Sequence, residues 1–153
     1  MNGKVAILIG SESDRDIIEN SIPYFEYFNI EMEIKVLSAH RTPKDVANFA
    51  TNAKSNGYSI LIGAAGMAAH LAGALKAHSI LPVIGIPLPG TFKNGMDSLL
   101  STVQMPKGVP VATMAVGKAG AINAAILCAE IMAINNNNIT DKLIQFKKNG
   151  SKL

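Results

Sequence analysis

The chain has 153 residues, of which 48% are hydrophobic, 16% are charged and a single one is cysteine. A chain of about this length forms one domain and buries roughly 70% of its unfolded surface, so an intrinsically disordered protein is not expected. One cysteine excludes a disulfide framework and a cysteine-rich zinc site, and it suits a reducing compartment.

Nothing in the sequence predicts export or membrane insertion. The first ten residues contain too short an apolar part for a signal peptide, and no small-residue cleavage site follows. No apolar run reaches the roughly 18 residues of a membrane span; residues 119–134 come closest, and Asn123 and Glu130 interrupt them. We therefore expect a soluble cytoplasmic protein without a membrane partner.

The net charge of +3 is a property of the C-terminal tail. Residues 139–153 carry four lysines against Asp141, and the ten basic and ten acidic residues of the remaining chain cancel. Aromatic residues make up only 5% and tryptophan is absent, so bases would find few stacking partners. We expect a solvated terminal helix and no nucleic-acid partner.

Strand and helix patterns alternate from the start of the chain. Residues 5–9 form a continuous apolar run, typical of a strand that is buried on both faces. A segment rich in serine and aspartate follows and can cap a helix that reaches Phe28. Pro23 predicts a kink or a break inside that helix, because proline removes an intrahelical hydrogen bond. Residues 34–37 are the second predicted strand.

The alternation continues through the second half. Thr42 before Pro43 predicts an N-cap and a first helical residue, and Gly57 is expected to end this helix. A strand over 60–62 and an alanine-rich helix over 67–78 follow. The remaining predicted elements are strands 83–86 and 111–116, a helix over 119–134, an asparagine linker over 135–138 and a last helix ending at Gly150.

Five strands that alternate with helices predict an α/β fold, a doubly wound parallel sheet with helices on both faces. Periodicity alone favours a flavodoxin-like or a Rossmann-like arrangement, with three α/β/α layers in a single domain. We assign residues 1–138 to this domain and residues 139–153 to a C-terminal helix and basic tail.

Ligands of such sheets bind outside the carboxyl ends of the strands. Small and polar residues stand at these ends, and helix N-termini with serines and one arginine could form an anion site, most simply for phosphate. The segment Gly-Ser-x-Ser-Asp could equally be a helix cap only. Neither a Walker A loop nor a dinucleotide fingerprint is present. The five predicted strand exits are residues 10–14, 38–43, 63–66, 87–90 and 117–120.

Among the histidines, His40 is the strongest candidate for a site residue, because it lies in a strand-exit loop beside Arg41. His70 could face a ligand or merely pack. His78 is expected at the surface or at a helix end, and Cys128 as a small buried residue among alanines. The three histidines share no local spacing, so no metal site is predicted.

Six segments, taken together and in this order, resemble one family. The chain resembles the class I 5-(carboxyamino)imidazole ribonucleotide mutases of bacterial purine biosynthesis over about residues 4–134, and the SAHRTP and QMP pieces are the most specific. The segments are GSESD at 10–14, SAHRTP at 38–43, AAHL at 68–71, DSLLS at 97–101, VQMP at 103–106 and GKAG at 117–120.

The resemblance implies an isomerase that moves a carboxyl group from the exocyclic nitrogen of an aminoimidazole ribonucleotide to a ring carbon. It implies no metal, no nucleotide cofactor and no ATP, and flavodoxin-like subunits in a homo-octamer with sites near subunit junctions. His40 would be the general acid and base, because histidine in general is accessible in both protonation states near neutral pH. The pocket would have to close around the released carbon dioxide.

The resemblance also implies which residues bind the ribonucleotide. Arg41, with Ser13 and Ser38, would hold the phosphate, since a guanidinium fork fits its oxygens bidentately. Ser11 and Asp14 would bind the substrate as well, with Asp14 accepting hydrogen bonds from ribose hydroxyls. The residues expected around the imidazole and carbon dioxide are Gly66 and His70.

The sequence departs from the family pattern at several positions. Members commonly have glycine in place of Met67 and proline in place of Ala72. Gly90 lies in a segment that lacks the serine often found after the fourth strand, and Arg15 replaces a large apolar residue.

Two alternative functions stay open. The first is direct carboxylation of aminoimidazole ribonucleotide with carbon dioxide, the class II reaction, which shares the fold and the histidine. The second is a non-catalytic module that binds a phosphate ligand.

Overall fold

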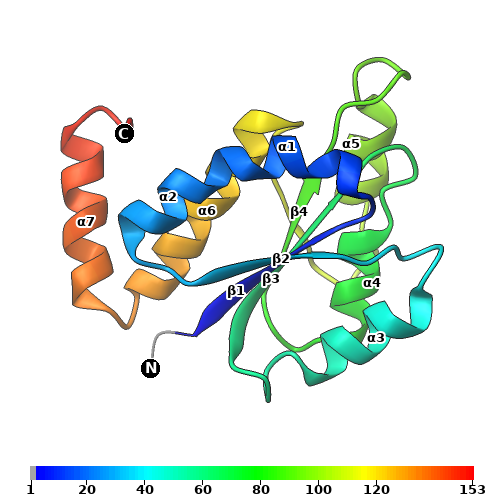
Figure 1. Ribbon diagram of the computed structural model, residues 1–153, viewed down its shortest axis with the longest axis horizontal. Coiled ribbons are helices and arrows are strands. Elements are labelled where there is room, and N and C mark those ends of the chain that lie inside the picture. Colours follow the sequence, from blue (N-terminus) through cyan, green and yellow to red (C-terminus); the bar gives the residue numbers. More distant parts are fainter. Residues whose placement is uncertain (1–2) are drawn as a thin grey trace.

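A five-stranded parallel sheet forms the centre of the computed structural model, which describes residues 3–153 (Figure 1). The strands lie in the order β2-β1-β3-β4-β5. This is the order of flavodoxin-like sheets, in which the chain reverses its direction of winding between β1 and β3. The predicted α/β class with a parallel sheet flanked by helices is confirmed. The strands are β1 (Lys4–Ile9), β2 (Met32–Val36), β3 (Tyr58–Ala65), β4 (Val83–Pro87) and β5 (Ala112–Thr113).

Side chains of the central strands alternate between two separate cores. In β1, Val5, Ile7 and Ile9 are buried on one face and Ala6 and Leu8 on the other. Because both faces are covered, residues 5–9 of this strand are all apolar, which is the pattern that predicts the strand from the sequence. Helices α1 (Arg15–Ile18), α2 (Ile22–Phe28) and α6 (Lys118–Ala133) cover the first face, and α3 (Pro43–Asn52) and α4 (Leu71–His78) cover the second (Figure 1).

The helical segment after β1 is broken, as Pro23 predicts. The 3-10 turns η1 (Glu12–Asp14) and η2 (Glu19–Ser21) flank α1, and α2 starts at Ile22. Pro23 is therefore in the first turn of α2, where its missing N–H costs no intrahelical hydrogen bond.

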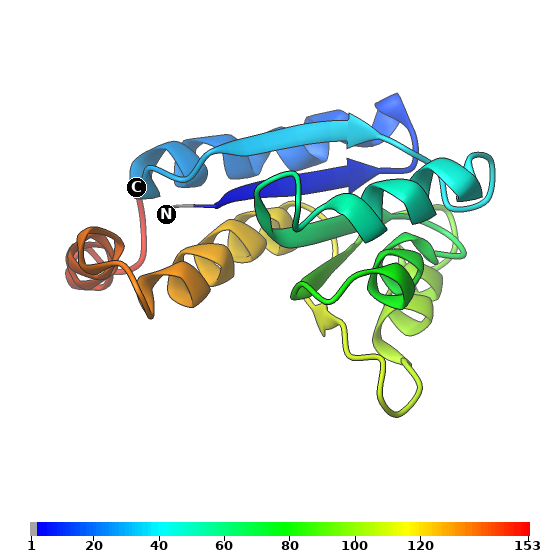
Figure 2. The same cartoon turned by 90° about the horizontal axis from the view of Figure 1, so that it is seen from below.

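The C-terminal helix α7 (Asn137–Lys148) packs on α2 and α6, far from the arrowheads of β1 and β2 (Figure 2). Ile139 and Phe146 are buried there. The side chain of Asn136 caps the helix by accepting hydrogen bonds from the amides of Asn138 and Ile139. The predicted linker over 135–138 is thus wrong in its second half, because Asn136 starts a helix instead of extending a loop.

Three predicted elements are shorter than expected. The helix expected from residue 67 begins at Leu71, and the helix expected to end at Gly57 ends at Asn52. The strand predicted over 111–116 is reduced to β5. Beyond it, the amides of Met114 and Gly117 donate to carbonyls of β4, but the chain between them leaves the ladder.

Helix α5 (Met96–Val103) was not predicted as an element. Its buried positions are Ser98 and Thr102, whereas the apolar side chains of Leu100 and Val103 are 54% and 46% exposed. The helix thus presents small hydroxyl residues to the core and apolar residues outward, the reverse of the usual pattern.

Two residues expected to lie outside any site do so. Cys128 is fully buried, and this burial raises the pKa of its thiol. His78 is the exposed last residue of α4. Within residues 3–153, none of the helices combines the length and the apolar character that crossing a bilayer would require.

Candidate functional site

A cavity of about 430 Å³ lies at the carboxyl ends of the strands. It is formed by the loops that follow β1, β2, β3 and β4. Residues 117–120, the fifth predicted exit, do not line it. The structure brings together all eight residues expected from the sequence, which are Ser11, Ser13, Asp14, Ser38, His40, Arg41, Gly66 and His70.

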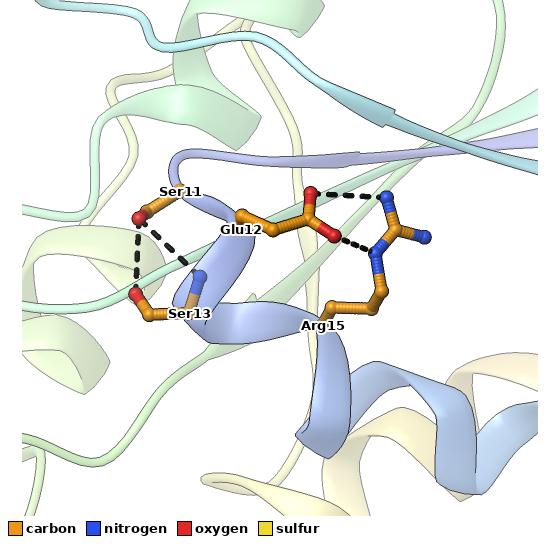
Figure 3. Close-up of polar contacts among 4 residues, drawn as sticks. All are labelled: Ser11, Glu12, Ser13 and Arg15. Carbon is orange, nitrogen blue, oxygen red and sulfur yellow. Dashed lines mark hydrogen bonds and ion pairs between the residues drawn. The ribbon is translucent and has the colours of Figure 1, made fainter.

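The loop after β1 separates its polar groups onto two sides (Figure 3). The Ser13 hydroxyl donates to the Ser11 hydroxyl at 2.9 Å, and both residues line the cavity. Glu12 and Arg15 form an ion pair with each other and do not line it. The charge of Arg15 is therefore neutralised outside the site.

The loop after β2 is closed by its own hydrogen bonds. The Thr42 hydroxyl lies 3.1 Å from both the amide and the carbonyl oxygen of Ser38. Thr42 occupies the N-cap position of α3 as predicted, but its hydroxyl does not bond a helix amide. The Ser38 hydroxyl accepts a hydrogen bond from the Arg41 amide at 3.2 Å. Residues 38–42 therefore form a hydrogen-bonded turn that carries His40 and Arg41.

Two histidines meet in the cavity. Nε2 of His40 and Nδ1 of His70 are 2.7 Å apart, with ring planes at 80°. One of the two nitrogens must donate and the other accept, so a single proton lies between the rings. His70 thus faces the cavity, which decides between the two possibilities left open for it. The pairing itself was missed, because the residues are 30 positions apart and no local pattern connects them.

The loop after β3 contains an unusual backbone conformation. Met67 has φ of +53°, in the left-handed region that residues other than glycine rarely occupy. Its side chain is 71% exposed and lines the cavity. From the loop after β4, Pro89, Gly90 and Thr91 complete the lining. Pro89 and Gly90 belong to the predicted strand exit over residues 87–90, whereas no sequence pattern indicated that Thr91 would line the site.

The cavity contains one carboxyl group whose ionisation is disfavoured. Burial raises the pKa of Asp14, and a backbone hydrogen bond at Ser11 and the positive charge of Arg41 only partly offset this effect. A carboxylate held in a partly buried cavity can accept hydrogen bonds from a ligand. Among residues 3–153, no group of three or more histidine, cysteine, aspartate or glutamate side chains is arranged to hold a metal ion.

Residues 4–152 match the AIR carboxylase family. The chain is 44% identical to the N5-carboxyaminoimidazole ribonucleotide mutase of Escherichia coli (strain K12) over 145 residues, 95% of this chain and 86% of the relative. Identity to the Bacillus subtilis (strain 168) mutase is also 44%, over 97% of this chain and 92% of the relative.

A crystal structure of Treponema denticola PurE superposes with a TM-score of 0.86 at 27% identity, covering 96% of this chain and 90% of that one. The sequence resemblance is confirmed along nearly the whole chain, including the segments that form the cavity. The chain belongs to the AIR carboxylase family, together with these N5-carboxyaminoimidazole ribonucleotide mutases.

Proposed function

We infer that this protein is an N5-carboxyaminoimidazole ribonucleotide mutase, an isomerase of purine biosynthesis. The observation that carries the inference is one cavity in which a histidine pair lies beside an arginine and several hydroxyl groups, in a chain 44% identical to two mutases. The reaction moves a carboxyl group from the exocyclic nitrogen of the substrate to a carbon of its imidazole ring.

His40 acts as the general acid and base in this proposal. As the bond between the exocyclic nitrogen and the carboxyl carbon breaks, His40 gives a proton to the nitrogen and carbon dioxide is released. The ring carbon then forms a bond to carbon dioxide and loses its own proton to His40. The imidazole thus ends in its starting state. The hydrogen bond to His70 supports this role, because it orients the ring and gives its proton a second acceptor.

In this proposal the phosphate and the ribose bind to cavity residues of the loops after β1 and β2. Arg41 holds the phosphate with Ser13 and Ser38, and a guanidinium offers several donors in one plane. Asp14 accepts from the ribose hydroxyls with support from Ser11. Gly66 and His70 contact the imidazole and the carbon dioxide.

His40→Asn tests the role of the histidine. We expect the turnover number to fall at least about 100-fold, the lower range for general acid–base catalysis, while ribonucleotide binding persists. Conversion is followed by NMR of carbon-13 carbamate substrate. His78→Asn is the matched control, because His78 is an exposed histidine outside the cavity. Equal turnover in His40→Asn would remove His40 from the mechanism.

The same assay distinguishes the mutase reaction from the direct carboxylation of aminoimidazole ribonucleotide. The purified protein is given either the carbamate substrate or aminoimidazole ribonucleotide with bicarbonate. We expect turnover of the carbamate. Turnover of aminoimidazole ribonucleotide with bicarbonate, and none of the carbamate, would instead establish direct carboxylation.

We propose a homo-octamer with sites near subunit junctions. Phe92 and the outward side chains of α5, Met96, Leu100 and Val103, are all more than 40% exposed, and Phe92 follows a residue of the cavity wall. A single chain leaves this apolar surface in water, which a neighbouring subunit would prevent. Sedimentation at micromolar concentration should show an octamer and Leu100→Glu a smaller species. A monomeric wild-type chain would contradict the proposal.

The proposed location is the cytoplasm, where the thiol of Cys128 would stay reduced. Cell fractionation with an antibody to the chain tests this.

A further inference from the structure

The loop that carries His70 is held by one side chain of α5. The Ala69 amide donates a hydrogen bond to the Ser101 hydroxyl at 3.0 Å, and the same hydroxyl lies 3.2 Å from the Met67 carbonyl oxygen. Ser101 is 32 positions away from Ala69 in the sequence. A single hydroxyl group therefore contacts the backbone on both sides of residue 68.

Of the hydrogen bonds that the Ser101 hydroxyl makes, the one that it accepts from the Ala69 amide does not depend on where its proton points. The Ser101 hydroxyl has a single proton, which it can give to Met67 or to the Asp97 and Ser98 carbonyls of its own helix, at 2.8 and 3.3 Å. Its lone pairs accept from Ala69 whichever carbonyl receives the proton. Ala69 is a buried residue, and without the Ser101 hydroxyl its amide would lose the hydrogen-bond acceptor that the structure provides.

The contact stabilises a backbone that has little intrinsic reason to stay in place. Met67 has left-handed φ, a conformation that persists in a residue with a side chain only where the surroundings determine it. Ser101 binds the loop at Met67 and two residues later. The left-handed φ also keeps Met67 out of α4, which begins at Leu71.

The consequence falls on the next residue. His70 follows Ala69 directly, and its Nδ1 meets His40 at 2.7 Å. A displacement of about 1 Å would lengthen this contact beyond hydrogen-bond range. We propose that Ser101 is a positioning residue, which sets the loop after β3 so that His70 stays aligned on His40. The inference rests on the role proposed above for the histidine pair.

Three variants separate positioning from general stability. Ser101→Ala removes the hydroxyl, and Ser101→Thr keeps it. Thr102→Val is the matched control, because Thr102 is on the same helix and its hydroxyl donates to the Ser98 carbonyl instead of contacting the loop. If Ser101→Ala does not fold, Ser101→Cys, which keeps a side chain of similar size, replaces it in the same measurements.

The variants are compared by kinetics with the carbamate substrate and by nitrogen-15 NMR of the histidine side chains. For Ser101→Ala we expect kcat to fall about tenfold or more, because small misplacements of catalytic groups are costly. KM should stay within about twofold, since the phosphate-binding residues lie on other loops. The imidazole signals of His40 and His70 should shift in this variant. Ser101→Thr and Thr102→Val should resemble the wild type in both measurements.

Unchanged imidazole signals and unchanged kcat in Ser101→Ala would overturn the inference, as would an equal loss of kcat in Thr102→Val. Shifted signals with full activity would support the positioning by Ser101 and overturn the catalytic role of the histidine pair. The NMR measurement thus tells a failure of the positioning from a failure of the proposed mechanism.

Discussion

The guanidinium of Arg41 donates a hydrogen bond from Nη2 to the carbonyl oxygen of Gly10 at 2.7 Å, across 31 residues of sequence. The contact connects the loop after β2 to the end of β1. This hydrogen bond uses one end of the planar guanidinium, which carries five N–H donors. It anchors the side chain, and the remaining donors are available to a ligand.

Replacing Arg41 with lysine should weaken ribonucleotide binding while keeping the charge. A lysine ammonium cannot bond the Gly10 carbonyl and also offer a planar fork to phosphate. We expect KM to rise about ten- to a hundredfold, since a hydrogen bond to a charged group contributes about 1.5–3 kcal/mol. Steady-state kinetics or calorimetry with the ribonucleotide measures the change.

Arg15→Lys is the control for this prediction, because Arg15 pairs with Glu12 and does not line the cavity (Figure 3). Its KM should equal that of the wild type. Equal KM values for Arg41→Lys and the wild type would show that Arg41 does not bind phosphate.

Asp14→Asn should make the protein more stable at neutral pH and its substrate binding weaker. Burial raises the pKa of Asp14 in the folded chain, so between the unfolded and the folded pKa the native state binds more protons. Stability is therefore lost as pH rises through this range, and the ionised carboxylate opposes folding at pH 7. Asparagine removes the charge, at the expense of hydrogen bonds to the ribose.

Thermal unfolding of wild type and Asp14→Asn across pH 4–8 measures this difference. The advantage of the variant should be largest near neutral pH and should shrink toward about pH 4, the ordinary range for an aspartate carboxyl. A variant less stable than the wild type at pH 7 would contradict the prediction. Both proteins must be compared at one concentration, since assembly shifts unfolding midpoints.

The sheet could be predicted because its chemistry is local. The central strands are covered on both faces and therefore contain continuous apolar runs, as in residues 5–9 of β1 and in β4. The strand-exit rule then gathers the site, since the carboxyl ends of parallel strands lie at one edge. Helix α5 was not predicted, because Ser98 and Thr102 face the core and the apolar side chains of the helix face outward.

The details of the site depend on contacts between distant residues, which no local pattern contains. The helix predicted from residue 67 begins at Leu71, because Met67 is left-handed, and the loop before the helix is held by the hydrogen bond from the Ala69 amide to Ser101. The distance between His40 and His70 likewise depends on two loops of different origin. Sequence could indicate that both histidines stand near one edge of the sheet, and only the tertiary structure brings them into contact.

Gly63→Ala should destabilise the fold by about 1–3 kcal/mol, because it overpacks the contact between β3 and α4. A Cβ atom at position 63 would lie 2.7 Å from the Cα atom of Ala72, a backbone atom that cannot rotate away. Denaturant unfolding measures the loss. Gly90→Ala is the control, since a Cβ there meets nothing within 4 Å, and its stability should be unchanged or slightly higher. Equal stabilities of the two variants would show that α4 moves freely on the sheet.

The stability of variants at Met67 should follow how well the new residue tolerates a left-handed backbone, and not how hydrophobic it is. The left-handed conformation costs a residue with a Cβ roughly 1–2 kcal/mol, and the side chain is 71% exposed, so little packing is lost on truncation. Glycine removes this strain but adds about 0.5–1 kcal/mol of unfolded-state entropy. We therefore expect Met67→Gly to be as stable as the wild type or up to about 1 kcal/mol more stable. The β-branched side chain of Met67→Val should instead make it the least stable of the three, because such residues are the least tolerant of positive φ. Denaturant unfolding at fixed protein concentration ranks them, and a valine variant as stable as the glycine variant would mean that the loop relaxes out of the left-handed conformation without cost.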